Sequence, residues 1–179
     1  SWPGYIAEEL FPTTLVPVCT PAIAAGLLRP RDLHTATLIG VSHLREQWTW
    51  WFEAAGLSAP IQPANEVSFE SSMMAIQAVL DGVGVAVAQL PYVSEALAAG
   101  RLVTPFPIVD QKYEGWYLAY RPIREKDPAL LAFRNWLHGE AESQRQIHKR
   151  LGLTRPRARS VTPKPPQTTV ITSLKSRKK

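Results

Sequence analysis

The segment Ser42-His43-Leu44-Arg45 joins the end of a predicted strand to the start of a predicted helix. In open α/β sheets, small ligands bind beyond the carboxyl ends of strands, where loop hydroxyls and helix amides can contact them. Ser42 would hydrogen-bond a polar ligand there, and Arg45 would pair with a carboxylate through two parallel hydrogen bonds. The alternative interpretation is an ordinary helix start followed by a solvated arginine.

Ser71 and Ser72 occupy an equivalent junction between a strand and a helix. A serine hydroxyl at this place can accept a hydrogen bond from a free amide of the first helical turn. The pattern favours helix capping over ligand contact, and both roles stay open.

Trp48, Trp50 and Trp51 form an aromatic group that could stack on a base or a sugar. At helical spacing, Trp48 and Trp51 share an apolar face with Leu44 and Phe52, whereas Trp50 points elsewhere. This pattern favours core packing, because large aromatic residues on an apolar face are mostly buried. Trp48 would also reach a ligand if the first turn of its helix borders a cleft.

The sequence shows no group of residues with the types and spacing of a catalytic or metal-binding site. His34, His43, His138 and His148 are scattered, and no pair has the spacing of metal ligands on a helix. Gly82-Val83-Gly84 follows a predicted helix and precedes a strand, the reverse of the order that a phosphate-binding loop needs. The sequence therefore predicts a protein that is not an enzyme and uses no cofactor or metal.

Strands and helices alternate along the chain, which predicts an α/β layered domain. The run Val85 to Ala88 is uniformly apolar and is predicted to be a strand buried on both faces. The final helix should begin at the capping acid Asp127 and end near Ala141. The predicted strands are 15–18, 37–41, 63–69, 85–88, 101–104 and 116–120, and the predicted helices are 21–25, 44–55, 71–81, 94–99 and 127–141, the last with Leu130, Phe133 and Leu137 on one face.

Charge divides the chain into two parts. Residues 1–148 contain all 15 acidic residues and 10 of the 20 basic ones, so this part has a net charge of −5 within a total of +5. Residues 149–179 carry the other 10 basic residues and few large apolar ones, and are expected to be a disordered basic tail. A solvated extension or a product of an altered reading frame is favoured there over contact with nucleic acid or acidic lipid. The mildly acidic body gives no support for a DNA-binding surface.

The single Cys19 excludes an internal disulfide and suits a reducing compartment. No stretch approaches the roughly 18 consecutive apolar residues that a membrane helix needs. A cytoplasmic protein without a membrane anchor is expected. The turn-like opening Ser1-Trp2-Pro3-Gly4 suggests that the natural start lies upstream.

Eight ordered motifs, spread over residues 1–143, resemble LysR-type transcription regulators of the glycine-cleavage-activator subgroup. Each motif is weak alone, and the ordered set is specific. They are Trp2-Pro3-Gly4, Leu15-Val16-Pro17-Val18-Cys19-Thr20-Pro21, Asp32-Leu33, Trp48-x-x-Trp51-Phe52-x-x-x-Gly56-Leu57, Ala78-Val79-x-Asp81-Gly82-Val83-Gly84-Val85-Ala86, Leu97-Ala98-Ala99-Gly100-Arg101-Leu102-Val103, Tyr117-x-x-Tyr120 and Phe133-Arg134-Asn135-Trp136-Leu137.

The resemblance implies a periplasmic-binding-protein-like fold of type 2, an α/β effector-binding domain with two lobes and a ligand cleft between them. One lobe is expected to be largely complete and the other partial. The implied division is residues 1–18 for a remnant of the first lobe with a crossover strand, 19–119 for the second lobe, 120–148 for the return segment and a helix on the first lobe, and 149–179 for the tail.

The same resemblance implies which residues would line the cleft and what would bind. The effector would be a small molecule, such as an amino acid or another small carboxylate. The protein would form homo-oligomers and would reach promoter DNA only through a helix-turn-helix domain upstream of this chain. The implied ligand-binding residues, together with Arg45 from the junction described above, are Cys19, Thr20, Ser42, His43, Leu44, Arg45, Trp48, Phe69, Ser71 and Gln89.

Two other interpretations compete with an effector-sensing fragment. A free-standing solute-binding protein would have an intact first lobe and an export signal upstream. A truncated or frameshifted remnant of a regulator would keep the related core without regulating anything.

Overall fold

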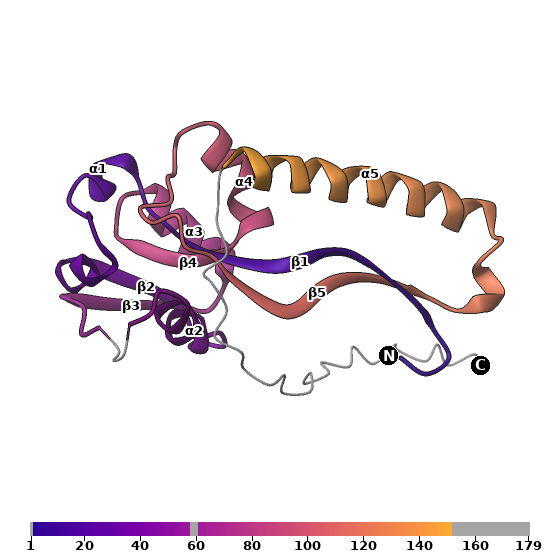
Figure 1. The fold of residues 1–179 in the computed structure, drawn as a ribbon, viewed down its shortest axis with the longest axis horizontal. Helices are drawn as coiled ribbons and strands as arrows, with labels where there is room; N and C mark the ends of the chain where they lie inside the picture. Colours follow the sequence, from indigo (N-terminus) through magenta and orange to yellow (C-terminus); the bar gives the residue numbers. More distant parts are fainter. Residues whose placement is uncertain (1, 58–60, 152–179) are drawn as a thin grey trace, which may run out of the picture.

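The computed structural model describes residues 2–57 and 61–151, which form one mixed sheet with helices (Figure 1). Most of the predicted basic tail lies outside the described residues. The elements in chain order are β1 (Ile6–Val18), α1 (Pro21–Ala24), the 3-10 helix η1 (Pro30–Thr35), β2 (Thr37–Val41), α2 (Glu46–Ala54), β3 (Asn65–Phe69), α3 (Ser72–Leu80), β4 (Val85–Gln89), α4 (Leu90–Ala98), β5 (Asp110–Tyr120), the 3-10 helix η2 (Pro122–Arg124) and α5 (Pro128–Arg150).

The sheet has the strand order β3-β2-β4-β1-β5. β2 is parallel to both β3 and β4, because α2 and α3 return the chain to the same end of the sheet each time. β1 is antiparallel to β4 on one side and to β5 on the other. The predicted α/β layered architecture is confirmed.

Two apolar cores lie on opposite faces of this sheet. Val16, Val18, Ala86 and Ala88 face α3 and α4 in one core. Their strand neighbours Leu15, Val85 and Val87 face α2 in the other core, around Trp51. Because successive side chains of a strand point to opposite faces, β4 is buried on both sides, as its uniform apolar run predicted.

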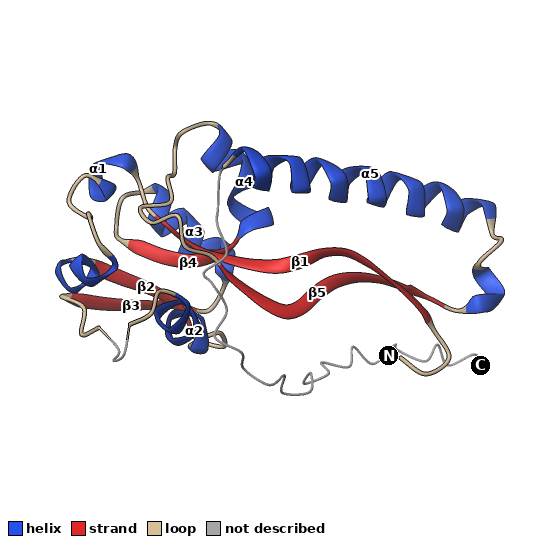
Figure 2. Ribbon diagram, in the orientation of Figure 1, coloured by secondary structure: helices blue, strands red, loops and turns tan. Residues whose placement is uncertain are grey.

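We call β2, β3, β4, residues 15–18 of β1 and helices α1 to α4 the sheet lobe. Residues 6–12 of β1, residues 115–120 of β5 and α5 form the ribbon arm, which extends away from the sheet lobe (Figures 1 and 2). The pairing of β1 with β5 has register shifts between Glu9 and Phe11 and between Pro12 and Thr14. These irregularities lie where β1 passes from the arm into the lobe. The predicted division of the chain at residues 18, 119 and 148 stays a prediction.

α5 begins as predicted but is longer. The Asp127 carboxylate accepts a hydrogen bond from the Ala129 amide at 3.0 Å, and Pro128 occupies the first turn. The helix continues to Arg150 instead of ending near Ala141, because Ala141 and Gln144 contact other elements and hold its second half in place. Of the three residues predicted to share one face of this helix, Leu130 and Leu137 are half-buried and Phe133 is 48% exposed.

Four other predictions for single elements were wrong. The strands predicted at 15–18 and 116–120 begin earlier, at Ile6 in β1 and at Asp110 in β5, because these two strands pair with each other along this length. α4 begins at Leu90, directly after β4, instead of at Ser94, because Pro91 is tolerated in the first helical turn. Residues 101–104 do not form a strand. Val103 makes one isolated antiparallel bridge with Cys19, and Pro105, which has no amide hydrogen, follows soon after.

The glycines before β4 have the turning role that the sequence predicted. Gly82 has a φ of 77°, a conformation that L side chains rarely adopt. At Gly84, a Cβ would overlap the backbone carbonyl of Thr37, so the close approach of β2 and β4 requires a residue without a side chain. Separately, among the described residues no helix has both the length and the apolar content needed to cross a membrane.

Candidate functional site

The order of the strands creates a switch point between β2 and β4. From β2 the chain runs through α2, on one face, to β3 at the edge, and then through α3, on the other face, back to β4. β2 and β4 pair only through Leu38 with Val85 and Ile39 with Ala86, so their carboxyl ends diverge. Ligands of open α/β sheets bind in a crevice of this kind.

A small cavity of about 10 Å³, the size of one water molecule, lies at these diverging ends. Its polar lining comes from four elements: Gln47 in α2, Ser72 in α3, Gln89 at the end of β4 and Tyr92 in α4. Val41 and apolar residues of α3 and β4 complete the wall. Four polar side chains thus meet where the topology favours a ligand.

Of the predicted ligand residues, Gln89 is the one that lines this cavity. Its Oε1 atom is buried and accepts no hydrogen bond within the described part of the chain. Ser71, one residue before the cavity wall, caps α3 by accepting a hydrogen bond from the Met73 amide at 3.2 Å. The favoured capping role of Ser71 is therefore confirmed.

Ser42 lies beside the end of β3, and its hydroxyl is already engaged. It contacts Ser68 Oγ at 3.2 Å and donates to Glu70 Oε1 at 3.0 Å. Its amide donates to the Phe69 carbonyl at 2.9 Å, so the structure brings Ser42 and Phe69 together. The carboxylate of Glu70, which the sequence analysis did not single out, adds negative charge at this junction.

The other predicted residues of this junction point to structural roles. Arg45 is exposed, and its Nε donates to the Ser42 carbonyl at 3.1 Å. Trp48 donates from its indole to the Ile39 carbonyl at 3.0 Å, which ties α2 to β2. His43 is exposed, and Leu44 is half-buried against the apolar core that lies between the sheet and helices α3 and α4. None of the four lines the cavity, and their ligand roles stay predictions.

Cys19 and Thr20 are not brought near Gln89. β1 is antiparallel to β4, with Val18 opposite Ala86 and Leu15 opposite Gln89, so β1 ends next to the start of β4, away from Gln89 at the end of β4. Cys19 is fully buried, and burial raises the pKa of its thiol to about 11. Its neutral side chain belongs to the apolar core that surrounds Trp51 of α2.

Sequence reasoning missed Gln47 and Tyr92 as candidate site residues and named Ser72 only as a helix cap. A signal for Gln47 was present, since it lies three residues after Leu44 and four before Trp51, on the apolar face of its helix. A polar residue at such a position is expected to face a polar partner or a cavity. Tyr92 carried no comparable local signal.

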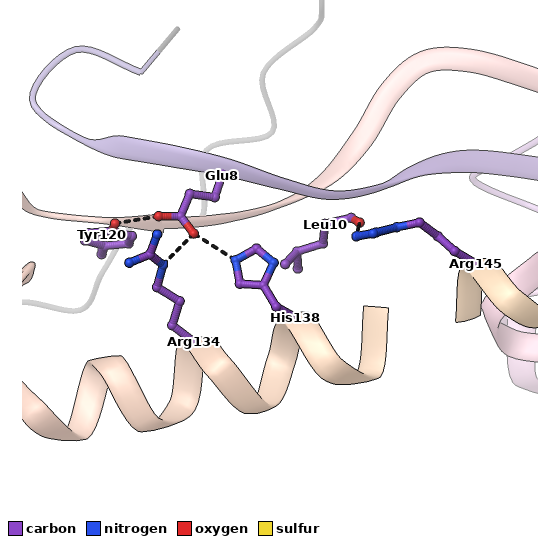
Figure 3. Close-up of polar contacts among 6 residues, drawn as sticks. All are labelled: Glu8, Leu10, Tyr120, Arg134, His138 and Arg145. Carbon is purple, nitrogen blue, oxygen red and sulfur yellow. Dashed lines mark hydrogen bonds and ion pairs between the residues drawn. The ribbon is translucent and has the colours of Figure 1, made fainter. Parts of the chain in front are cut away.

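A second polar cluster, also missed, joins the three elements of the ribbon arm (Figure 3). The Glu8 carboxylate on β1 accepts hydrogen bonds from Tyr120 on β5 at 2.6 Å, from Arg134 on α5 at 2.7 Å and from His138 on α5 at 2.8 Å. Arg145 of α5 donates further along to the Leu10 carbonyl at 3.0 Å. We call Glu8, Tyr120, Arg134 and His138 the Glu8 cluster.

The Glu8 cluster holds its carboxylate in the charged form. Desolvation by itself would raise the pKa of Glu8, but the hydrogen bonds from Tyr120, His138 and Arg134 outweigh it and lower the pKa from 4.5 to about 2. The same contact raises the pKa of Tyr120, chiefly because its hydroxyl donates to the carboxylate. This geometry supports fastening of α5 to the ribbon, with no sign of acid–base chemistry at neutral pH.

Comparison with known proteins connects this fold to one family. The model of the LysR substrate binding domain matches residues 1–142. The chain is 36% identical over 137 residues to the HTH-type transcriptional activator AmpR of Enterobacter cloacae, covering 76% of this chain and 46% of that relative. It is 32% identical over 149 residues to the glycine cleavage system transcriptional activator of Escherichia coli (strain K12), covering 82% of this chain and 48% of that one. The chain therefore spans about half the length of the curated relatives it matches.

Solved structures agree with the sequence comparison. The effector domain of the transcriptional regulator AmpR of Pseudomonas aeruginosa is 33% identical, with a TM-score of 0.64, and the match covers 84% of this chain and 70% of that chain. The AmpR effector binding domain of Citrobacter freundii is 29% identical, with a TM-score of 0.63 and coverage of 80% and 70%. The predicted family and the predicted periplasmic-binding-protein-like fold are confirmed. The chain belongs to the LysR substrate-binding domain family.

Proposed function

We propose that this chain is the effector-sensing portion of a LysR-type transcription regulator and that the cavity at the switch point is its share of the effector site. The observation that carries the proposal is the meeting of Gln47, Ser72, Gln89 and Tyr92 at the diverging ends of β2 and β4 in a member of this family. The first lobe would supply the opposite wall of the cleft.

In this proposal, the effector acts by shifting a conformational equilibrium. A ligand that prefers a closed cleft changes the relative orientation of the lobes, and a helix-turn-helix domain outside this chain transmits the change to promoter DNA. The protein would work in the cytoplasm, where that DNA lies, and would not be an enzyme. The names of the relatives, which are transcriptional activators, support this role.

A homo-oligomer belongs to the same proposal. Met73 and Met74 are exposed on α3, at 63% and 56%, and both are large apolar side chains that a second subunit could cover. α3 also borders the cavity through Ser72. An interface on this helix would place the effector site next to the subunit contact.

The expected effector is a small polar molecule, an amino acid or another small carboxylate. The test is a thermal-shift screen of the 179-residue chain against the common amino acids and small carboxylates, followed by calorimetric titration of each hit. We expect at least one saturable ligand, whose binding is weakened by Gln89→Leu and unchanged by the exposed control Arg101→Ala. Absence of any saturable ligand, in this chain and in the chain extended upstream, would contradict the proposal and favour a remnant without regulatory function.

A free-standing solute-binding protein is the second candidate, supported only by the shared fold. The coding sequence upstream distinguishes the two. An in-frame helix-turn-helix supports the regulator, and an export signal followed by an intact first lobe supports the solute-binding protein.

A further inference from the structure

We propose that Gln47 and Gln89 form a clamp that selects one uncharged hydrogen-bonding group of the effector, a primary carboxamide or a hydroxyl, over a carboxylate. This inference rests on the proposed function and concerns only the part of the ligand that enters the cavity. A carboxylate elsewhere on the same molecule would lie outside the clamp.

Both glutamines line the cavity, and one of their polar atoms is buried without a partner. Gln47 is only 7% exposed and contributes to the cavity wall. Gln89 Oε1 is buried and accepts no hydrogen bond within the described chain. Leaving a buried polar group unsatisfied costs about 1 to 3 kcal/mol. A hydrogen-bond donor placed in the cavity would satisfy Gln89 Oε1, and Gln47 lines the same cavity.

The two side chains suit a neutral partner. A glutamine amide offers N–H donors and a carbonyl acceptor, so a pair of them can both donate to and accept from one carboxamide or hydroxyl group. A carboxylate only accepts hydrogen bonds. With the Gln89 amide oriented as in the structure, a carboxylate would leave the Gln89 carbonyl unsatisfied and would face it with like partial charge. The unpartnered Gln89 acceptor therefore points to a ligand that carries a donor.

The charges around the cavity favour the same class of ligand. No lysine or arginine lines it among the described residues. Arg45, the cation that the sequence suggested as a ligand partner, is exposed and donates to the Ser42 carbonyl. The carboxylate of Glu70 precedes the first turn of α3, and one amide of that turn, Met73 N–H, already donates to Ser71. The start of α3 therefore attracts an incoming anion less strongly than an uncapped helix N-terminus would.

The size of the cavity limits what can enter. A volume of about 10 Å³ holds one water-sized group, so only the tip of a ligand fits. The matched probes are acetamide and acetate, which have nearly the same shape and differ in charge and in the presence of an N–H donor. Each can place one such tip between Gln47 and Gln89.

The test follows the side-chain carboxamide signals of Gln47 and Gln89 by NMR in the 179-residue chain during titration with each probe. We expect both signals to shift saturably with acetamide, with an apparent Kd about tenfold or more below that for acetate. Gln77, whose exposed amide already donates to Asp81 at 2.9 Å, is the internal control, and its signal should not move.

Variants make the assignment specific. Gln47→Leu should remove the saturable shift of the Gln89 signal, and Gln89→Leu should do the same for Gln47, so one of the two suffices if the other fails to fold. Gln77→Leu should leave both responses unchanged. Equal or tighter binding of acetate would overturn the clamp. Absence of a saturable response to either probe would overturn it as well, and would mean that the cavity holds only a structural water.

These outcomes separate the clamp from the proposed function. If the effector screen finds a ligand but acetate matches acetamide, only the selectivity fails. If acetamide binds between the glutamines but no metabolite binds the chain or its extended form, the proposed function fails while the clamp stands.

Discussion

The sheet lobe and the ribbon arm use different interactions. In the sheet lobe, Trp51 and its neighbours fill one apolar core, and aliphatic residues around Val79 fill the other. In the arm, α5 is fastened to the two strands mainly by the Glu8 cluster and by Arg145. Large apolar side chains of the arm stay exposed, namely Trp116, Tyr117, Leu131, Phe133 and Trp136.

This difference shows that apolar burial supports the sheet lobe more than it supports the ribbon arm. Burial of apolar surface is the main stabilising force in folding, so the lobe contains its own source of stability. The arm leaves Trp136 58% exposed and relies on charged groups that are partly solvated. We therefore expect substitutions in the lobe to cost more than substitutions in the arm.

The largest effect is expected for Trp51→Ala in the lobe. Trp51 is fully buried, and its indole donates to the Ile108 carbonyl at 3.1 Å. Truncation should lower the free energy of unfolding by about 3 to 5 kcal/mol, measured by chemical denaturation. Trp51→Phe, which keeps most of the ring and loses the donor, is the milder control and should cost clearly less. If Trp51→Ala lowered the free energy of unfolding by less than the arm variants do, the expected difference between the sheet lobe and the ribbon arm would be contradicted.

The next effect is expected for Gly84→Ala, also in the lobe. The added Cβ would overlap the Thr37 carbonyl, which is backbone and cannot move away without separating β2 from β4. We expect a loss of about 2 to 3 kcal/mol in the same assay. Gly139→Ala in α5 is the matched control, because its Cβ would meet no atom within 4 Å. That control should stabilise the helix by about 0.5 to 1 kcal/mol.

A smaller effect is expected for Glu8→Gln in the arm. The amide keeps the shape of the side chain but removes the charge that Arg134 and His138 contact. Because both partners are about one-third exposed, the cost at neutral pH should be only about 1 to 2 kcal/mol. Hydrogen exchange should accelerate at residues 6–12 and 115–120 and stay unchanged in β4. Faster exchange throughout the lobe would mean that the two regions are not separable.

The pH dependence of the stability of Glu8→Gln tests whether the charge of Glu8 stabilises the arm. The pKa of Glu8 is lowered from 4.5 to about 2 in the folded chain, so its contribution is present above pH 4.5 and is lost as the pH falls toward 2. Between these values the parent protein should lose more stability than Glu8→Gln, and the two should converge near pH 2. If the stability of the two proteins changed in parallel with pH, the Glu8 charge would not contribute to the stability of the arm.

The smallest effect is expected for Ser71→Ala at the start of α3. Loss of the hydrogen bond from the Met73 amide should cost about 1 kcal/mol, a typical value for a helix cap. Ser143→Ala is the control, since Ser143 donates to the Gly139 carbonyl within α5 and caps nothing. A Ser71→Ala cost equal to that of the control would show that α3 does not need its cap.

The elements were largely predictable from local signals. β2 occupies the residues that were predicted, and the caps Ser71 and Asp127 act as their types and positions indicated. The end of α5 was not predictable, because it depends on contacts with distant elements, such as the hydrogen bond from Ser94 to Gln144. Of the candidate site, only Gln89 was both predicted and found at the cavity.

The sequence by itself determined the family, the alternation of strands and helices, and the buried strand Val85 to Ala88, because these depend on composition, periodicity and order along the chain. Only the tertiary structure decided which side chains meet. The antiparallel pairing of β1 separates Cys19 from Gln89, and Glu8 finds Arg134 and His138 across 126 and 130 residues of chain. Such meetings depend on strand register and helix packing, which no local pattern of residues encodes.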